Sequence, residues 1–204
     1  VCVAHAGPPF GSSSFDGSLG DVSEESRSSR RPSPLAGRKP TKDDLARFAT
    51  DDPDAIDDVL PAGSGQLSLL IVGINPGLWT AAVNAPFARP GNRFWPSLHQ
   101  AGLTDHLVDA SLGLSIEDEE HLLSRGIGIT NLVGRATARA DELRNEELRD
   151  GGARLVERLS EIRPKAVAIA GATAVSRRLG STSRSPGRPM ASGSVLPSGC
   201  SSMT

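Results

Sequence analysis

The chain has 204 residues, a formal net charge of −2 and two cysteines, Cys2 and Cys200. This length predicts one domain with extensions. Two cysteines exclude a disulfide-built scaffold, a four-cysteine zinc site and a four-cysteine iron–sulfur cluster. The near-neutral charge provides no global electrostatic case for nucleic-acid binding, so such a function would need a local site. No apolar run approaches the roughly 18 residues of a membrane span, and no signal segment opens the chain. We therefore expect a cytoplasmic protein (nucleoid-associated, if bacterial) with no membrane partner.

The first 62 residues predict no packed domain. Residues 1–40 are rich in serine and proline and lack aliphatic periodicity. Such a segment cannot bury enough apolar area to offset the entropy of ordering it, which predicts a disordered extension. It is either a tail that contacts a partner or an extension without a role. Residues 41–62 predict a short helix over Lys42–Phe48 followed by an acidic linker.

Residues 63–180 alternate aliphatic runs with amphipathic segments. The run Leu67–Ile74, closed by Asn75-Pro76-Gly77, is typical of a strand buried on both faces. Strands that alternate with helices indicate an α/β fold with a mostly parallel sheet. After residue 180 the periodicity ends, which predicts an irregular tail over 181–204. The further predicted elements are, in chain order, a helix over Asn92–Ala101, a helix from Ser115, an apolar segment over Gly126–Val133, a helix over Leu143–Ile162, a strand over Ala166–Ala170 and a helical segment over Gly171–Leu179.

Two places carry candidate chemistry. Ligands of open α/β sheets bind beyond the carboxyl ends of the strands, which makes Asn75 a candidate site residue; the alternative is a local Asn-Pro-Gly turn. Phe87 lies between prolines, outside any predicted element, where a planar heterocycle could stack on it. Phe94 and Trp95, in contrast, fit the core. The arginines beside them, Arg89 and Arg93, contact phosphate or are merely solvated.

Four stretches resemble the mismatch-specific uracil/thymine-DNA glycosylases, a branch of the uracil-DNA glycosylase superfamily. They occur in the family's order and spacing: GINPGLWTAAV (73–83), PFARPGNRFWPSLHQAGLT (86–104), RGIGITNLVGRATARADEL (125–143) and GGARLVERLSEIRPKAVAIAG (151–171). The resemblance implies a three-layer fold whose central sheet is flanked by helices. It implies a monofunctional enzyme of base-excision repair that flips uracil, or a related mispaired or damaged pyrimidine, out of double-stranded DNA and hydrolyses its N-glycosidic bond. It also implies a monomer with no metal or organic cofactor.

The resemblance further assigns roles to single residues. Asn75 matches the residue that holds the attacking water near the sugar C1′. Because an amide is no strong base, the chemistry would rest on positioning and on stabilising the departing uracil anion. Phe87 matches the aromatic that stacks on the flipped base. Asn131 matches a position where an amide can hydrogen-bond the pyrimidine, and it could equally cap a loop. The other positions that the resemblance places at the base are Gly73, Ile74, Gly77, Thr80 and Thr137, and Arg89 and Arg93 remain candidates for the DNA backbone.

The end of the chain departs from the family. The family's second signature is an apolar run, Leu-Pro and then Asn-Pro-Ser-Gly-Leu, whereas Val195–Gly199 is followed here by Cys200. A shifted reading frame would explain this tail. If the tail is native, the sheet lacks its last strand and helix and exposes apolar area on the neighbouring strand, which predicts poor stability and weak activity. The alternative function is thus a truncated or frameshifted glycosylase that binds mismatched or abasic DNA without efficient turnover. A third possibility is a nucleotide-binding protein with no DNA role.

Overall fold

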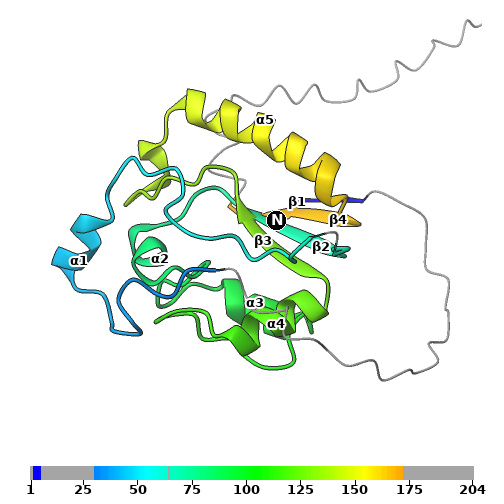
Figure 1. Ribbon diagram of the computed structural model, residues 1–204, viewed down its shortest axis with the longest axis horizontal. Helices are drawn as coiled ribbons and strands as arrows, with labels where there is room; N and C mark the ends of the chain where they lie inside the picture. The colour runs from blue at the N-terminus through cyan, green and yellow to red at the C-terminus, as the bar shows by residue number, and fades with distance from the viewer. Residues whose placement is uncertain (1, 6–29, 64, 172–204) are drawn as a thin grey trace, which may run out of the picture.

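A computed structural model describes residues 2–5, 30–63 and 65–171 (Figure 1). The strands form one four-stranded sheet in the order β1-β4-β2-β3. The central strand β2 pairs in parallel with β3 on one side and with β4 on the other. The expected α/β fold with a mostly parallel sheet is therefore confirmed. The bounds of the strands are β1 (Cys2–His5), β2 (Leu69–Gly73), β3 (Ile127–Asn131) and β4 (Ala166–Ile169).

Helices cover both faces of the sheet. In Figure 1, α5 lies along one face, while α2, α3 and α4 lie on the other. At the start of α4, the Ser115 hydroxyl accepts a hydrogen bond from the backbone N–H of Asp118 at 3.0 Å, the cap that the sequence predicts. The helices are α1 (Lys42–Arg47), α2 (Leu78–Val83), α3 (Phe94–Gln100), α4 (Ile116–Ser124) and α5 (Asn145–Ile162), with a 3-10 turn over Ala140–Glu142.

Strand β2 is buried on both faces, as its uninterrupted aliphatic sequence predicts. Leu70 and Val72 pack in one apolar cluster with Leu155 and Leu159 of α5. Ile71 points the other way, because successive strand residues alternate between faces. It belongs to the larger cluster that the second helical layer covers, which includes Val83, Trp95, Leu98, Leu122 and Ile129. Two core layers, one on each face of β2, thus fix the strand whose carboxyl end leads into Asn75.

Both outer strands of the parallel set have a backbone partner. On the far side of β3, Val59 exchanges two hydrogen bonds of 2.8 Å with Ile129. On the far side of β4, β1 pairs in antiparallel register, with Val3 opposite Ala168. Among the described residues, β4 therefore has a neighbour on each side, and one of them is a strand that carries no strand signal in the sequence. The last strand and helix that are expected to be missing would fall in residues 172–204, which lie outside the described residues.

Residues 30–40, expected to be disordered, pack against the domain. Arg31 bonds Asp57 through its backbone N–H (2.6 Å) and its guanidinium Nε (2.8 Å). The Asn84 side chain donates to the carbonyl of Arg31 at 2.7 Å and to the Asp57 carboxylate at 2.9 Å. Polar contacts with residues far along the chain therefore help to order this segment. Residues 2–5, which belong to the same extension 1–40 that is expected to be disordered, also differ from the expectation, since they form β1.

Three further expectations concern the segment after Asn75-Pro76-Gly77, the end of the chain and membrane-spanning helices. Short α2 follows directly on Asn75-Pro76-Gly77, where the sequence predicts no helix. The helical segment expected over 171–179 and the irregular tail 181–204 lie outside the described residues. Among the helices that the structure does describe, none has both the length and the apolar composition needed to cross a bilayer.

Candidate functional site

Two loops leave the carboxyl ends of β2 and β3 side by side. Beyond the strands the backbone pairing continues: Leu132 donates to the carbonyl of Gly73 at 2.8 Å, and Val133 donates to that of Ile74 at 2.9 Å. Farther along, the Thr137 N–H donates to the carbonyl of Pro76 at 3.1 Å. The loops 73–77 and 131–137 therefore form one rigid platform at the sheet edge where α/β proteins bind ligands.

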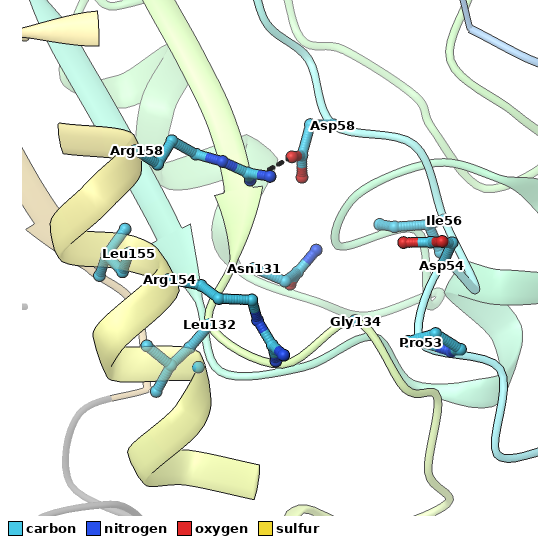
Figure 2. A pocket seen from close by; sticks show the side chains of 11 residues that line it. Pro53, Asp54, Ile56, Asp58, Asn131, Leu132, Gly134, Arg154, Leu155 and Arg158 are labelled. Carbon is cyan, nitrogen blue, oxygen red and sulfur yellow. Dashed lines mark hydrogen bonds and ion pairs between the residues drawn. The ribbon is translucent and has the colours of Figure 1, made fainter. Parts of the chain in front are cut away.

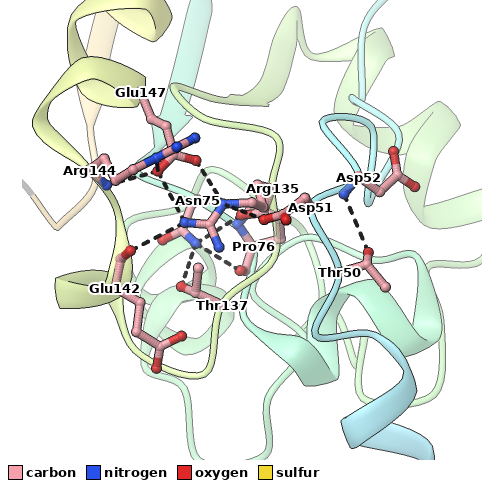
Figure 3. A network of polar contacts seen from close by, with 10 residues as sticks. All are labelled: Thr50, Asp51, Asp52, Asn75, Pro76, Arg135, Thr137, Glu142, Arg144 and Glu147. Atoms are coloured by element: carbon pink, nitrogen blue, oxygen red, sulfur yellow. Dashed lines mark hydrogen bonds and ion pairs between the residues drawn. The ribbon is translucent and has the colours of Figure 1, made fainter.

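The amide of Asn75 is fixed in one orientation on this platform (Figure 3). Its Nδ2 donates to the backbone carbonyl of Arg135 at 3.0 Å and to that of Pro76 at 3.1 Å. It also lies 2.8 Å from the hydroxyl of Thr137. A carbonyl oxygen only accepts hydrogen bonds, so the amide nitrogen, not the oxygen, must face these groups. Asn75 Oδ1 is consequently turned away from them, and no described residue donates to it.

An ion pair holds the loop that carries these acceptors. Arg135 binds Glu147 of α5 through two bonds, Nε–Oε1 at 2.7 Å and Nη2–Oε2 at 3.0 Å. The Glu147 carboxylate also accepts from the backbone N–H of Arg144 at 2.8 Å, which caps α5. The bonds from Arg135, followed by those from Arg144, lower the pKa of Glu147 to about 2 although burial opposes the shift. Glu147 thus remains ionised and anchors the residue whose carbonyl orients Asn75.

Gly73, Phe87 and Asn131 meet at the ends of the two strands. Gly73 and Asn131 are partners in the parallel ladder. A Cβ atom on Gly73 would lie 2.5 Å from Asn131 Oδ1 and 3.4 Å from Phe87 Cζ. The first distance is far shorter than a van der Waals contact. Only glycine at position 73 therefore allows the amide of Asn131 and the ring of Phe87 to approach this strand end together.

The loop that carries Phe87 holds it in a constrained conformation. Phe87 has a φ of +55°, which is unusual for a bulky residue and persists only where the surroundings impose it. The indole N–H of Trp95 donates to the carbonyl of Pro86 at 3.1 Å. The Phe94 ring stacks on Phe87 with centroids 3.7 Å apart and planes 18° apart. Because Phe94 occupies one face of Phe87, a base can stack only on the opposite face.

A cavity of about 200 Å³ lies on the α5 side of Asn131 (Figure 2). In its wall, the Asp58 carboxylate forms an ion pair with Arg158 and accepts a hydrogen bond from the backbone N–H of Asn131. Desolvation dominates here and raises the pKa of Asp58 despite these bonds. Asp58 directly precedes Val59, which pairs with Ile129 of β3. Its bond from the Asn131 N–H therefore fixes the backbone at the carboxyl end of β3.

The other predicted site residues separate into three groups. Ile74 packs its side chain in an apolar cluster with Val133 and Leu143, so only its backbone is available to a ligand. Gly77 and Thr80 line a different cavity, of about 500 Å³. Arg89 and Arg93 are exposed and form no ion pair with any residue that the structure describes. Within the described ranges, no three His, Cys, Asp or Glu side chains are grouped so as to hold a metal ion.

Thr137 and Glu147 show what the sequence does and does not reveal about this site. Thr137 is expected at the base, but its observed contact is with the Asn75 amide, and its side chain is buried. The role of Glu147 could not be predicted, because the sequence shows only an ordinary acidic residue in the first turn of a helix.

A comparison with protein families matches residues 60–202 to the family described as the uracil DNA glycosylase superfamily.

Proposed function

Because the chain belongs to the uracil DNA glycosylase superfamily, we propose that it is a monofunctional glycosylase of the mismatch-specific type, in which Asn75 places the attacking water. The family membership implies glycosidic-bond hydrolysis on DNA in general. The substrate of this proposal is a uracil, or a related pyrimidine, flipped out of a G·U or G·T mismatch. Unstacking costs a few kcal/mol and least for a mismatched base, which favours such a substrate.

The oriented amide of Asn75 is the observation that carries the proposal. Its nitrogen is engaged by Arg135, Pro76 and Thr137, which leaves Oδ1 as an acceptor for one water hydrogen. A water bound there directs an oxygen lone pair at C1′ of the deoxyribose. The O–C1′ bond forms as the C1′–N1 bond breaks, the base leaves with the bonding electron pair, and the proton of the water passes to solvent.

Phe87 and Asn131 serve the base in this proposal. The free face of the Phe87 ring stacks on the flipped pyrimidine, and the Asn131 amide hydrogen-bonds its polar edge. Donors that face the departing anion stabilise it, and one such donor is worth about 3–4 kcal/mol in comparable sites. Phe87 and Asn131 both lie close to Gly73, which supports this assignment, because a ring and an amide then meet at the same strand end.

The test is single-turnover release of uracil from a G·U duplex, with A·U, G·T and single-stranded oligonucleotides as comparisons. We expect release from G·U to be fastest. The Asn75→Ala variant should lose about 100-fold or more in rate while it still binds the duplex, because loss of positioning of this kind costs that much. Wild-type release by Asn75→Ala would refute the mechanism, and equal rates on all four substrates would refute the mismatch preference.

A second candidate function follows from the tail. Residues 195–204 lack the Asn-Pro pair and the leucine of the family's second signature. A protein without that loop would bind mismatched or abasic DNA but release little base. Binding and release measured on the same G·U oligonucleotide separate the two candidates. Tight binding with no release supports the second, and binding followed by release of the base supports the first.

A further inference from the structure

A cationic cavity adjoins the loop of Asn75, and part of it comes from outside the family-matching region. The cavity has a volume of about 500 Å³. Lys39 and Arg89 both line it, together with Gly77 and Thr80. Lys39 lies 21 residues before the start of the family match at residue 60. The lysine is therefore a feature of this chain's own amino-terminal segment.

The structure holds the backbone of Lys39 firmly. On one side Arg38 binds the Asp44 carboxylate through two bonds, of 2.8 and 3.0 Å. On the other side Pro40 is buried and Thr41 forms a capping box with Asp44 at the start of α1. The bonds from Arg38, followed by those from Thr41, keep the pKa of Asp44 well below its usual range. Asp44 is thus already paired with Arg38 and is not engaged by Lys39.

Both cations in the cavity are available to a ligand. Lys39 and Arg89 are exposed, and neither has an ion-pair partner among residues 30–63 and 65–171. The remaining walls are mostly apolar, with Leu45 of α1, Leu78 and Trp79 of α2, and Pro90. Apolar walls lower the local dielectric and concentrate the field of the two cations. The indole of Trp79 is itself held by a 2.8 Å bond to the carbonyl of Ser111.

The cavity adjoins the two loops that hold the Asn75 side chain. Gly77 belongs to the same loop as Asn75, and it pairs with Thr137, whose hydroxyl contacts the Asn75 amide. Ala138, the next residue, lines the cavity. In a bound DNA strand, the anions closest to the attacked C1′ are the phosphates that flank the same deoxyribose. Because the cavity begins at the loop that carries Asn75, its cation pair suits one of these phosphates.

We propose that Lys39 and Arg89 bind a phosphodiester next to the flipped nucleotide, so that the cavity wall formed by Lys39 is part of the DNA-binding surface. This proposal rests on the proposed function for the identity of the nucleotide, but its contact is sequence-independent. A phosphate contact adds affinity on any duplex and releases a condensed counterion. It should therefore be visible in the salt dependence of binding, whether or not the base is cleaved.

The experiment measures the affinity of the full chain for a duplex that carries a tetrahydrofuran abasic analogue opposite guanine, at 50 to 200 mM salt. Loss of one phosphate contact should lower the slope of log K against log salt by about 0.9. Across this fourfold range, the affinity of Lys39→Ala should thus fall about 3.5-fold less than that of the wild type. The double variant Lys39→Ala/Arg89→Ala should lose no more slope than this, because both cations bind the same phosphodiester, and Lys39→Arg should retain the slope.

Lys42→Ala is the matched control, because Lys42 is an equally exposed lysine of the same segment that does not line the cavity. It should leave the slope unchanged. Equal slopes for wild type and Lys39→Ala, or equal losses for Lys39→Ala and Lys42→Ala, would overturn the proposal. Thermal melting of each variant shows that the fold is intact. A Lys39-dependent slope in a protein that releases no uracil would sustain this inference while the proposed function fails.

Discussion

The Gly73→Ala substitution tests whether Asn131 and Phe87 share one strand end. The new Cβ would lie 2.5 Å from Asn131 Oδ1, whereas ordinary contact begins at 3.4 Å, so the amide must retreat by about 0.9 Å. Overpacking of this kind costs about 1–3 kcal/mol. We expect the low end, about 1 kcal/mol, because the atom displaced belongs to a side chain. For a chain of this size, that corresponds to a decrease in Tm of about 2–4 °C.

The effect on base release should be much larger than the effect on stability. A displacement near 1 Å in a positioning group costs about 100-fold in rate. Gly152→Ala is the control, because a Cβ at this position of α5 meets no atom within 4 Å. It should raise stability by about 0.5–1 kcal/mol, as alanine is the better helix former, and leave the rate unchanged.

A double-mutant cycle decides whether the clash is with Asn131. In an Asn131→Ala background the obstructing amide is absent, so Gly73→Ala should destabilise the protein by only a few tenths of a kcal/mol. Chemical denaturation of the four proteins gives the coupling directly. Equal costs of Gly73→Ala in the two backgrounds would refute the geometry, as would uracil release by Gly73→Ala at the wild-type rate.

Two further predictions concern the supports of the site and of the sheet. Glu147 has a pKa of about 2 in the fold against an ordinary 4.5, so its contribution to stability is present above pH 4.5 and is lost as the pH falls toward 2. The difference in free energy of unfolding between wild type and Glu147→Gln should therefore shrink from pH 7 to pH 3. A constant difference would contradict the assignment. Deletion of residues 1–5 removes the antiparallel partner of β4, so amide hydrogen exchange in Ala166–Ile169 should accelerate; unchanged exchange would show that β1 does not protect the strand.

The aliphatic strands and the amphipathic helix of α5 could be predicted because their signal is local. Strand β2 is apolar at every position, and α5 keeps its leucines on one face. The ordering of residues 30–40 could not be predicted in this way. It depends on a bond from Arg31 to Asp57, 26 positions away, and on a bond from Asn84 to Arg31, 53 positions away. Neither end of such a contact has a distinctive sequence around it.

In the site as well, the roles that depend on local sequence could be predicted and those that depend on distant contacts could not. Asn75 and Phe87 stand out because a strand end and an aromatic between prolines are unusual places for their side chains. The structural role of Thr137 becomes visible only when the chain is folded, since its partner Asn75 lies 62 residues earlier. Lys39 lacks any local signal, because a lysine in a polar, proline-rich segment has the composition of a disordered region. Its place beside Gly77 results from the capped turn of α1.

The central claim is that Asn75, oriented through its nitrogen, presents Oδ1 to one water beside a base stacked on Phe87. The most direct measurement is a crystal structure of the full chain bound to a G·U duplex with an uncleavable uridine analogue. We predict a water about 2.6–3.2 Å from Asn75 Oδ1 and in line with C1′, with the pyrimidine on the face of Phe87 that Phe94 leaves free. A flipped base seated away from Phe87, or an Asn75 Oδ1 bonded to protein instead of water, would contradict the account.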